Sequence, residues 1–295
     1  MKVVPVPASL DESSFDALAD GVAAADGQRV LLDARRLRWV DPYGAVGLLA
    51  AGEVAGRTER PVLQLPAPGD VLSYLGRMDF FRHAGGIFEI HGDGRRAADG
   101  ASDVLLEVTR VESHGDVHLV VDRVHERAGA ILSRQLHYPP ALAMQFGTIL
   151  SEVCQNIMEH AQAPGWVAAQ TYNWQKRLGR KVVVVAVMDL GVGFQGSLAG
   201  EHAARYGDGW GDAAALEAAF IHGLTRFRDP GRGQGLQQIR KLVGRVGGKI
   251  SIRSGTARIA DVPDWDDAKP LEERLAPFPG TQIVIVLPAR VEAEA

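Results

Sequence analysis

Cysteine is almost absent from this chain of 295 residues, because Cys154 is the single example. One cysteine cannot form an internal disulfide framework or a cysteine-rich zinc site. Long apolar runs are also missing: the longest aliphatic run, residues 182–188, has seven residues, whereas a membrane-spanning helix needs roughly 20. The first residues lack the apolar core and the cleavage site of a signal peptide. The sequence therefore predicts a cytoplasmic protein without membrane insertion.

The chain has no large excess of charge of either sign. Its 32 Lys and Arg residues against 36 Asp and Glu residues give a formal net charge of −4. This mildly acidic balance argues against nucleic acid as the main partner. Hydrophobic residues make up 46% and charged residues 23% of the chain, so we expect a packed core rather than disorder.

A polar, glycine-rich stretch at residues 91–102 divides the chain and is typical of a linker or an exposed loop. Residues 1–90 alternate short apolar runs with helical periodicity, and residues 103–295 do so again on a larger scale. The length allows one large domain or two ordinary ones. The pattern predicts an α/β protein with two domains joined by residues 91–102.

Hydrophobic periodicity and the positions of glycine and proline predict the individual helices and strands. The first part is expected to have strands at residues 2–6, 29–33 and 61–65, and helices at 13–24, 43–56 and 69–77. The second part is expected to have strands at residues 103–111, 166–174, 181–188, 249–254 and 281–287, and helices at 114–136, 141–161, 212–222 and 234–246. Asp41 followed by Pro42 predicts the N-cap and first turn of the helix at 43–56. Residues 258–279 are expected to form a surface loop.

A polar stripe marks the helix expected at residues 141–161. Glu152, Asn156 and His160 are spaced by four and therefore share one helical face. A carboxylate, an amide and an imidazole could activate water, bind Mg²⁺ through oxygen and contact phosphate. The alternative is a polar face that only contacts solvent.

The apolar run at residues 182–188 predicts a central strand buried on both faces. Asp189 follows it directly, so its carboxylate is expected to be half-buried and to need a partner. Gly191 and Gly193 would allow a ligand to approach the backbone closely. The alternative is a strand that ends in a tight turn.

Residues 191–196 also spell the dinucleotide-binding pattern G-x-G-x-x-G. That pattern requires a helix that opens at the third glycine, Gly196, and an acidic residue about 20 positions later. Asp212 lies at a suitable distance, but among glycines rather than after an apolar strand. A Rossmann arrangement is therefore not favoured.

Alternate glycines precede the helix expected at residues 234–246. Gly231, Gly233 and Gly235 would expose backbone N–H groups at a helix N-terminus, which favours phosphate binding. Arg232 could add a bidentate contact. No G-x-x-x-x-G-K-[ST] pattern occurs in the chain. The alternative is a surface loop without a ligand.

The order and spacing of these segments resemble the GHKL ATPase superfamily, which includes histidine kinases and anti-sigma-factor serine kinases. The resemblance covers about residues 103–288 and consists of four boxes: Glu152…Asn156, Asp189-x-Gly191-x-Gly193, Gly231-x-Gly233-x-Gly235-Leu236 and Gly280-Thr281. It implies a two-layer α/β sandwich in which ATP lies between helices and a mixed sheet. Residues 194–230 would form a lid over the nucleotide.

The resemblance also implies residue roles. Asn156 would bind the Mg²⁺ that bridges the ATP phosphates, and Glu152 would orient or deprotonate the attacking group. Asp189 would accept a hydrogen bond from the adenine amino group, with Thr281 assisting. The glycines would let the backbone pass beside the base (Gly191, Gly193) and wrap the phosphates (Gly231, Gly233, Gly235).

Residues 30–49 resemble a STAS domain, in which a strand that ends in Asp precedes a turn and a helix. The phosphorylatable serine of that family is absent, because the turn consists of Asp41, Pro42, Tyr43 and Gly44. The resemblance covers about residues 1–90 and implies an interaction or scaffold domain.

Together these resemblances imply a bacterial signalling protein that binds ATP and Mg²⁺ and acts as a serine/threonine kinase or ATPase on a protein partner. The alternative is a non-catalytic switch in which ATP controls partner engagement through the lid and the STAS-like domain. A histidine kinase is less favoured, because the upstream histidines lie on or beside a single helix (His114, His118, His125, His137). Related kinases dimerise, so a homodimer is possible.

Overall fold

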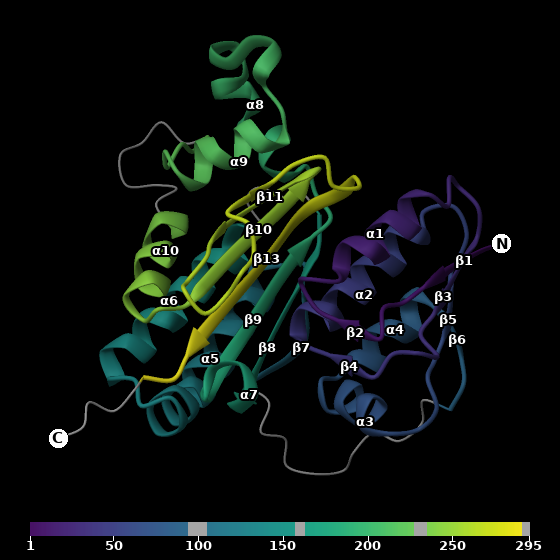
Figure 1. Ribbon diagram of the computed structural model, residues 1–295, viewed down its shortest axis with the longest axis horizontal. Helices are drawn as coiled ribbons and strands as arrows, with labels where there is room; N and C mark the ends of the chain where they lie inside the picture. Colours follow the sequence, from purple (N-terminus) through teal and green to yellow (C-terminus); the bar gives the residue numbers. More distant parts are fainter. Residues whose placement is uncertain (94–104, 157–162, 227–234, 291–295) are drawn as a thin grey trace.

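The computed structural model describes residues 1–93, 105–156, 163–226 and 235–290 (Figure 1). Most of the expected linker at residues 91–102 therefore lies outside the described residues. Helices and several sheets alternate along the chain. The α/β class expected from the sequence is confirmed.

A four-stranded parallel sheet forms in the N-terminal part, in the order β1-β3-β5-β6. Its strands are β1 (Lys2–Pro5), β3 (Val30–Asp33), β5 (Val62–Gln64) and β6 (Glu89–His91). The helices are α1 (Phe15–Ala23), α2 (Pro42–Ala55), α3 (Asp70–Arg77) and α4 (Phe80–Ile87), and a small parallel pair joins β2 (Ser9–Leu10) to β4 (Trp39–Val40). The sequence predicted three of the four sheet strands and three of the helices, but it missed α4, β6 and the β2–β4 pair.

A seven-stranded sheet forms in the C-terminal part, in the order β12-β11-β10-β13-β9-β8-β7. The strands are β7 (Leu106–Val111), β8 (Gly165–Trp174), β9 (Arg180–Asp189), β10 (Lys249–Gly255), β11 (Ala257–Asp261), β12 (Leu271–Glu272) and β13 (Phe278–Pro288). Every neighbouring pair among the described strands is antiparallel. The mixed sheet expected from the resemblance is therefore wrong. A Rossmann arrangement, which needs parallel strands, is excluded for this sheet.

The C-terminal helices are α5 (His114–Gln135), α6 (Pro140–Asn156), α7 (Gln175–Leu178), α8 (Gly193–Tyr206), α9 (Asp212–Phe220) and α10 (Gly235–Arg245). Helix α5 begins with a capping box between Ser113 and Asp116. One expectation needs correction, because the expected loop at 258–279 contains most of β11, all of β12 and the start of β13. The helix expected at 212–222 is present as α9, and α8 was not expected.

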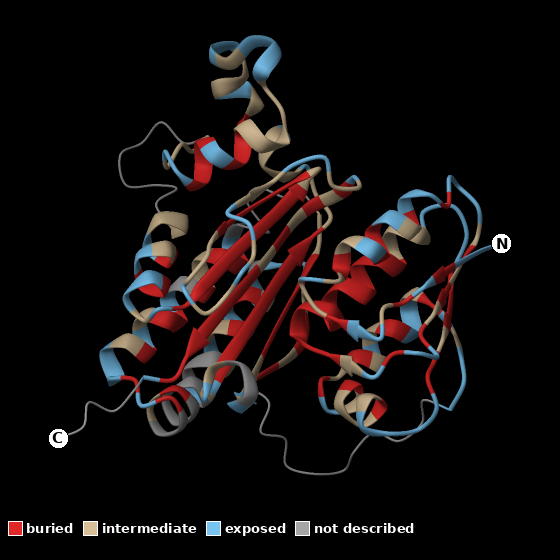
Figure 2. Ribbon diagram, viewed as in Figure 1, coloured by how far each residue is buried: buried red, intermediate tan, exposed pale blue. Residues whose placement is uncertain are grey.

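Both faces of the seven-stranded sheet are buried (Figure 2). Successive side chains of a strand point to opposite faces, so β9 divides its apolar run between two cores. Val184 and Met188 belong to the core shared with the N-terminal part, and Val185 and Val187 belong to the core under α5, α6 and α10. The expectation that residues 182–188 form a strand buried on both faces is confirmed.

Helix α2 lies between the two sheets (Figure 1). Asp41 caps it by accepting a hydrogen bond from the Gly44 N–H at 2.8 Å, and Pro42 is its first residue, as expected. Every residue from Pro42 to Gly52 is buried, so the helix has no polar face over these positions. It contacts both β8 and β9 of the large sheet. A helix that is apolar all round must be buried all round, so the two parts of the chain share one core.

Gly47 shows how closely the layers approach in this shared core. A Cβ at this position would lie 2.8 Å from the Phe15 ring and 3.4 Å from Met188 Cε. We expect Gly47→Ala to lower the free energy of unfolding by about 1–2 kcal/mol, measured by urea denaturation. Overpacking costs about 1–3 kcal/mol, whereas the higher helix propensity of alanine contributes at most about 1 kcal/mol of stability.

Gly85 in α4 provides the matched control, because a Cβ there would meet nothing within 4 Å. Gly85→Ala is expected to raise the free energy of unfolding by about 0.5–1 kcal/mol. Stabilisation of both variants would contradict the tight packing of α2 between the sheets.

Candidate functional site

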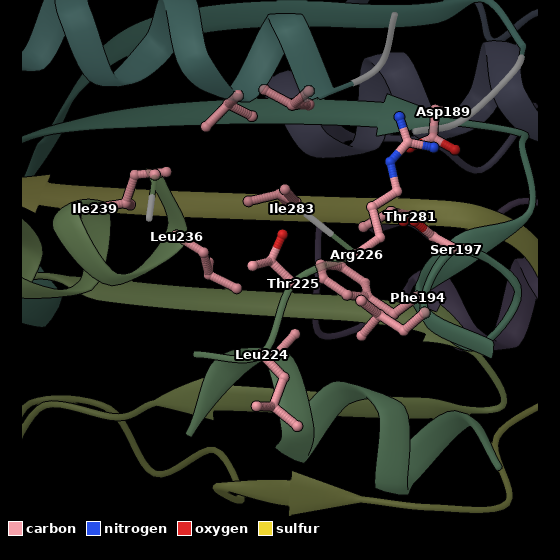
Figure 3. Close-up of a pocket in the computed structure, with 16 residues that line it drawn as sticks. Asp189, Phe194, Ser197, Leu224, Thr225, Arg226, Leu236, Ile239, Thr281 and Ile283 are labelled. Carbon is pink, nitrogen blue, oxygen red and sulfur yellow. The ribbon is translucent and has the colours of Figure 1, made fainter. Parts of the chain in front are cut away.

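A pocket opens on the helix-covered face of the large sheet, at the end where β9 finishes and β13 begins (Figure 3). It contains about 930 Å³ of empty space, a volume that includes space open to solvent. Strands β9 and β13 form its floor, and α8, α10 and the segment that follows α9 form its walls. Segments far apart in the sequence thus meet around one cavity.

Asp189 is the buried acidic group of the pocket. It is 8% exposed, and its Oδ1 accepts a hydrogen bond from the Gly191 N–H at 2.9 Å. The backbone N–H and the hydroxyl of Thr281 also donate to its carboxylate. Burial raises the pKa of Asp189 to about 6, and these hydrogen bonds oppose the rise. The carboxylate is therefore charged at neutral pH.

Two glycines with positive φ let the turns around Asp189 pack together. Gly193 has φ +63° and Gly280 has φ +74°. A Cβ at Gly193 would lie 2.5 Å from Ser254 Oγ, and a Cβ at Gly280 would lie 2.6 Å from Asp189 Oδ1. Ser254 joins both turns, because its Oγ accepts from the Phe194 N–H at 3.0 Å and donates to the Gly280 carbonyl at 3.1 Å.

Glu152 and Gly235 lie against each other beside the pocket. A Cβ at Gly235 would lie too close to Glu152 Oε2 for van der Waals contact, so a larger residue there would require the carboxylate to move. This oxygen is buried and has no hydrogen-bond partner among the described residues. Burial raises the pKa of Glu152. The result is an unpartnered carboxylate oxygen next to the first residue of α10.

The structure brings together most of the sequence-predicted site residues that it describes. Asp189, Gly193, Gly235 and Thr281 line the pocket, Gly191 bonds to Asp189, and Glu152 contacts Gly235. Asn156 is the last residue of α6, one turn after Glu152, and its side chain is not among those described. His160, Gly231, Arg232 and Gly233 lie outside the described residues.

Sequence reasoning missed many residues that line the pocket, among them Phe194, Ser197, Leu224, Thr225 and Arg226. These five come from α8 and from the segment after α9, within the region that the resemblance assigned to the lid. The small residues and glycines of α8 hid its helical periodicity, whereas the helix expected at residues 212–222 is present as α9. Asp212, the first residue of α9, accepts from the N–H and hydroxyl of Thr256 through Oδ2, both at 2.8 Å.

The turn that resembles the STAS phosphorylation site is buried. Asp41 is 5% exposed and Tyr43 is 1% exposed. Burial raises the pKa of Asp41 to about 8. The hydroxyl of Tyr43 has no hydrogen-bond partner among the described residues. This turn is therefore part of the core between the two sheets rather than an accessible surface.

No protein-family model and no curated protein matches the chain. Among the residues that the structure describes, no helix is long and apolar enough to cross a membrane. The same residues contain no group of three or more His, Cys, Asp and Glu side chains arranged to hold a metal ion.

The raised pKa of Asp189 makes a prediction about stability. The folded-state pKa of about 6 lies above the ordinary value of 3.8, so the folded protein binds an extra proton between these values. The charged, buried carboxylate therefore costs on the order of 3 kcal/mol above pH 6, and this cost disappears as the pH falls toward 4.

We expect Asp189→Asn to lack this pH dependence. As the pH falls from 7.5 to 4, urea denaturation should show the free energy of unfolding of the wild type rising relative to that of the variant by on the order of 3 kcal/mol. The difference between the two proteins isolates Asp189 from other titrating groups. A constant difference over this pH range would contradict the buried, charged state of Asp189.

Proposed function

We propose that this pocket binds ATP with Mg²⁺ and that the protein is an ATP-dependent serine/threonine kinase or ATPase that acts on a protein partner in a signalling pathway. One observation carries the proposal: Asp189 and Gly235 line the same pocket, and Glu152 packs against Gly235. The proposal includes a GHKL-type ATP-binding domain at residues 103–295 and a STAS-like domain at residues 1–90.

Asp189 suits the recognition of adenine. A buried carboxylate prefers a partner that donates hydrogen bonds, and the adenine amino group is such a donor. Gly191 and Thr281 hold the carboxylate in place, so the Asp189 side chain loses little conformational entropy when a ligand binds. The apolar side chains of Leu236, Ile239 and Ile283 would cover the flat base.

The opposite end of the pocket suits phosphates. Helix α10 begins at Gly235, and the N-H groups of a helix N-terminus favour negative charge. Arg226 also lines the pocket, and Figure 3 shows its guanidinium directed toward Asp189 rather than toward α10. The phosphates would therefore lie at the start of α10.

Asn156 fits Mg²⁺ through its chemistry. An amide oxygen suits this hard cation, which is commonly held by one or two protein oxygens together with substrate phosphates. Glu152 Oε2 is buried without a partner among the described residues, and such an atom needs a compensating contact, which the attacking water or hydroxyl would provide. The bound ion would neutralise phosphate charge during transfer.

Glu152 is the candidate base. Its buried position raises its pKa, and a base works best when its pKa approaches the working pH. Glu152 would take the proton from the attacking group, a water in hydrolysis or a partner hydroxyl in transfer. Gly235 keeps the space that this carboxylate occupies.

The alternative of a non-catalytic switch gains no support from the N-terminal part. Helix α2 is buried from Pro42 to Gly52. Release of this part to engage another protein would expose that apolar surface, at roughly 25 cal/mol for each Å².

The binding proposal predicts that Asp189→Asn weakens ATP affinity by about 10- to 100-fold in the presence of Mg²⁺, measured by calorimetry. The variant loses a hydrogen bond to a charged group, which contributes about 1.5–3 kcal/mol. Asn156→Ala is expected to abolish the Mg²⁺-dependent part of binding.

Asp33→Asn is the control for this experiment. Asp33 also ends a strand, but it pairs with Arg35 on the surface at 2.7 Å. Its replacement should leave ATP affinity unchanged. Equal affinities in the wild type and in Asp189→Asn would reject the site.

The catalytic proposal predicts that Glu152→Gln binds ATP but releases or transfers phosphate about 10²- to 10⁴-fold more slowly, the range lost with a general base. The measurement is phosphate release alone and ³²P transfer to candidate partners. Activity in Glu152→Gln equal to that of the wild type would exclude Glu152 as the base, and an inactive wild type that binds ATP would favour the switch.

A further inference from the structure

Three cations lie on the face of the large sheet that is opposite the pocket. Lys249, Arg253 and Arg258 project toward the N-terminal part and are 5%, 1% and 7% exposed. Two acidic residues near the start of α1 meet them. Asp16 accepts from Arg253 Nε at 2.9 Å and from Arg258 at 2.5 Å, and Glu12 lies 2.8 Å from Lys249 Nζ.

Asp16 is the carboxylate that neutralises Arg253. Among the described residues, the other acceptors of Arg253 are neutral: the carbonyls of Gly255 and Ala276 and the side chain of Gln282. A guanidinium this deeply buried is stable only with its countercharge in place. The position of Arg253 on β10 therefore depends on a residue of the N-terminal part.

The cations and the pocket floor occupy adjacent positions on the same strands. Arg253 pairs with Gln282, and Gln282 pairs with Met188, in one row across β10, β13 and β9. The adjacent row across these strands consists of Ser254, Thr281 and Asp189. Thr281 and Asp189 line the pocket, and Ser254 bonds to Phe194, which also lines it. A shift of β10 at Arg253 would therefore move Ser254 with it.

Two walls of the pocket form hydrogen bonds to Ser254 on β10 and to Thr256, which lies between β10 and β11. Ser254 accepts a hydrogen bond from the N–H of Phe194, the second residue of α8. Thr256 donates to Asp212, the first residue of α9. Both helices lead to segments that line the pocket.

We propose that Asp16 is a positioning residue for the pocket, which makes the N-terminal part a component of the nucleotide site rather than a separate module. Asp16 holds Arg253, Arg253 fixes the end of β10, and this end fixes the start of α8 and of α9. The inference rests on the proposed function only in naming nucleotide as the ligand.

The test follows amide hydrogen exchange by mass spectrometry in the full chain without nucleotide. In Asp16→Asn, peptides that contain the N–H groups of Phe194 and Thr256 should exchange at least about 5-fold faster than in the wild type, the lower end of measured coupling between sites. Because no nucleotide is present, a wild type that fails to bind ATP overturns the proposed function and leaves this result standing.

Glu53→Gln is the matched control. Glu53 on α2 accepts from Arg110 on β7 at 2.7 Å, an ion pair between the same two parts at the other edge of the sheet. This variant should leave the exchange of Phe194 and Thr256 within about 2-fold of the wild type, below the range of coupled sites. Unchanged exchange in Asp16→Asn, or equal acceleration in both variants, would overturn the proposal.

A double variant separates positioning from general stability. Asp16→Asn with Arg253→Met removes the buried charge of Arg253 together with that of its partly exposed partner Asp16, so no uncompensated charge remains at position 253. The proposal expects a melting temperature near that of the wild type together with fast exchange at Phe194 and Thr256. A return of exchange to the wild-type rate would show that Asp16 has only a structural role. The double variant also answers the question if Asp16→Asn alone does not fold.

Discussion

Burial of α2 between two sheets is the constraint on which the rest of the structure depends. The helix has no polar face from Pro42 to Gly52, so it needs an apolar surface on every side. Helices α1 and α4 and the β2–β4 pair cover part of that surface, and β7, β8 and β9 of the large sheet cover another part. One consequence is that the large sheet loses contact with water on the face away from the pocket.

Because side chains alternate along each strand, the same strands contact the N-terminal part on one face and the helices and the pocket on the other. On β9 and β13, one set of residues packs on the N-terminal part, and the intervening set packs on the helices or lines the pocket. Asp189 and Thr281 belong to the second set. A shift of one residue in register would exchange the two sets, so correct docking of the N-terminal part and correct orientation of the pocket residues require the same register.

The sequence was sufficient for elements with strong local signals. The apolar run before Asp189 could only be a buried strand, and Asp41-Pro42 marked the start of α2. Short elements such as β2, β4 and β12 have too few residues for periodicity to be visible, because tertiary pairing stabilises them. Helix α8 was missed because Gly196 and Gly200 reduce helix propensity and alanines blur its apolar face.

The same limits apply to the site. The spacing of the boxes was enough to nominate Asp189, Thr281, Glu152 and Gly235, and these residues do meet in space. Ser254 and Arg226 carry no local pattern, so their part in the site depends on pairing and on chain reversal that spacing does not encode. The antiparallel order of the large sheet was likewise beyond single-sequence reasoning, because register and direction are set by non-local contacts.

The surfaces that meet across α2 belong to one polypeptide, which changes how their association responds to concentration. Partners encoded separately dissociate on dilution, whereas covalently joined surfaces bind each other at a fixed effective concentration. The two surfaces are also always made in equal amounts. Their contact therefore does not depend on expression level, and compensating substitutions on both sides can accumulate within a single gene.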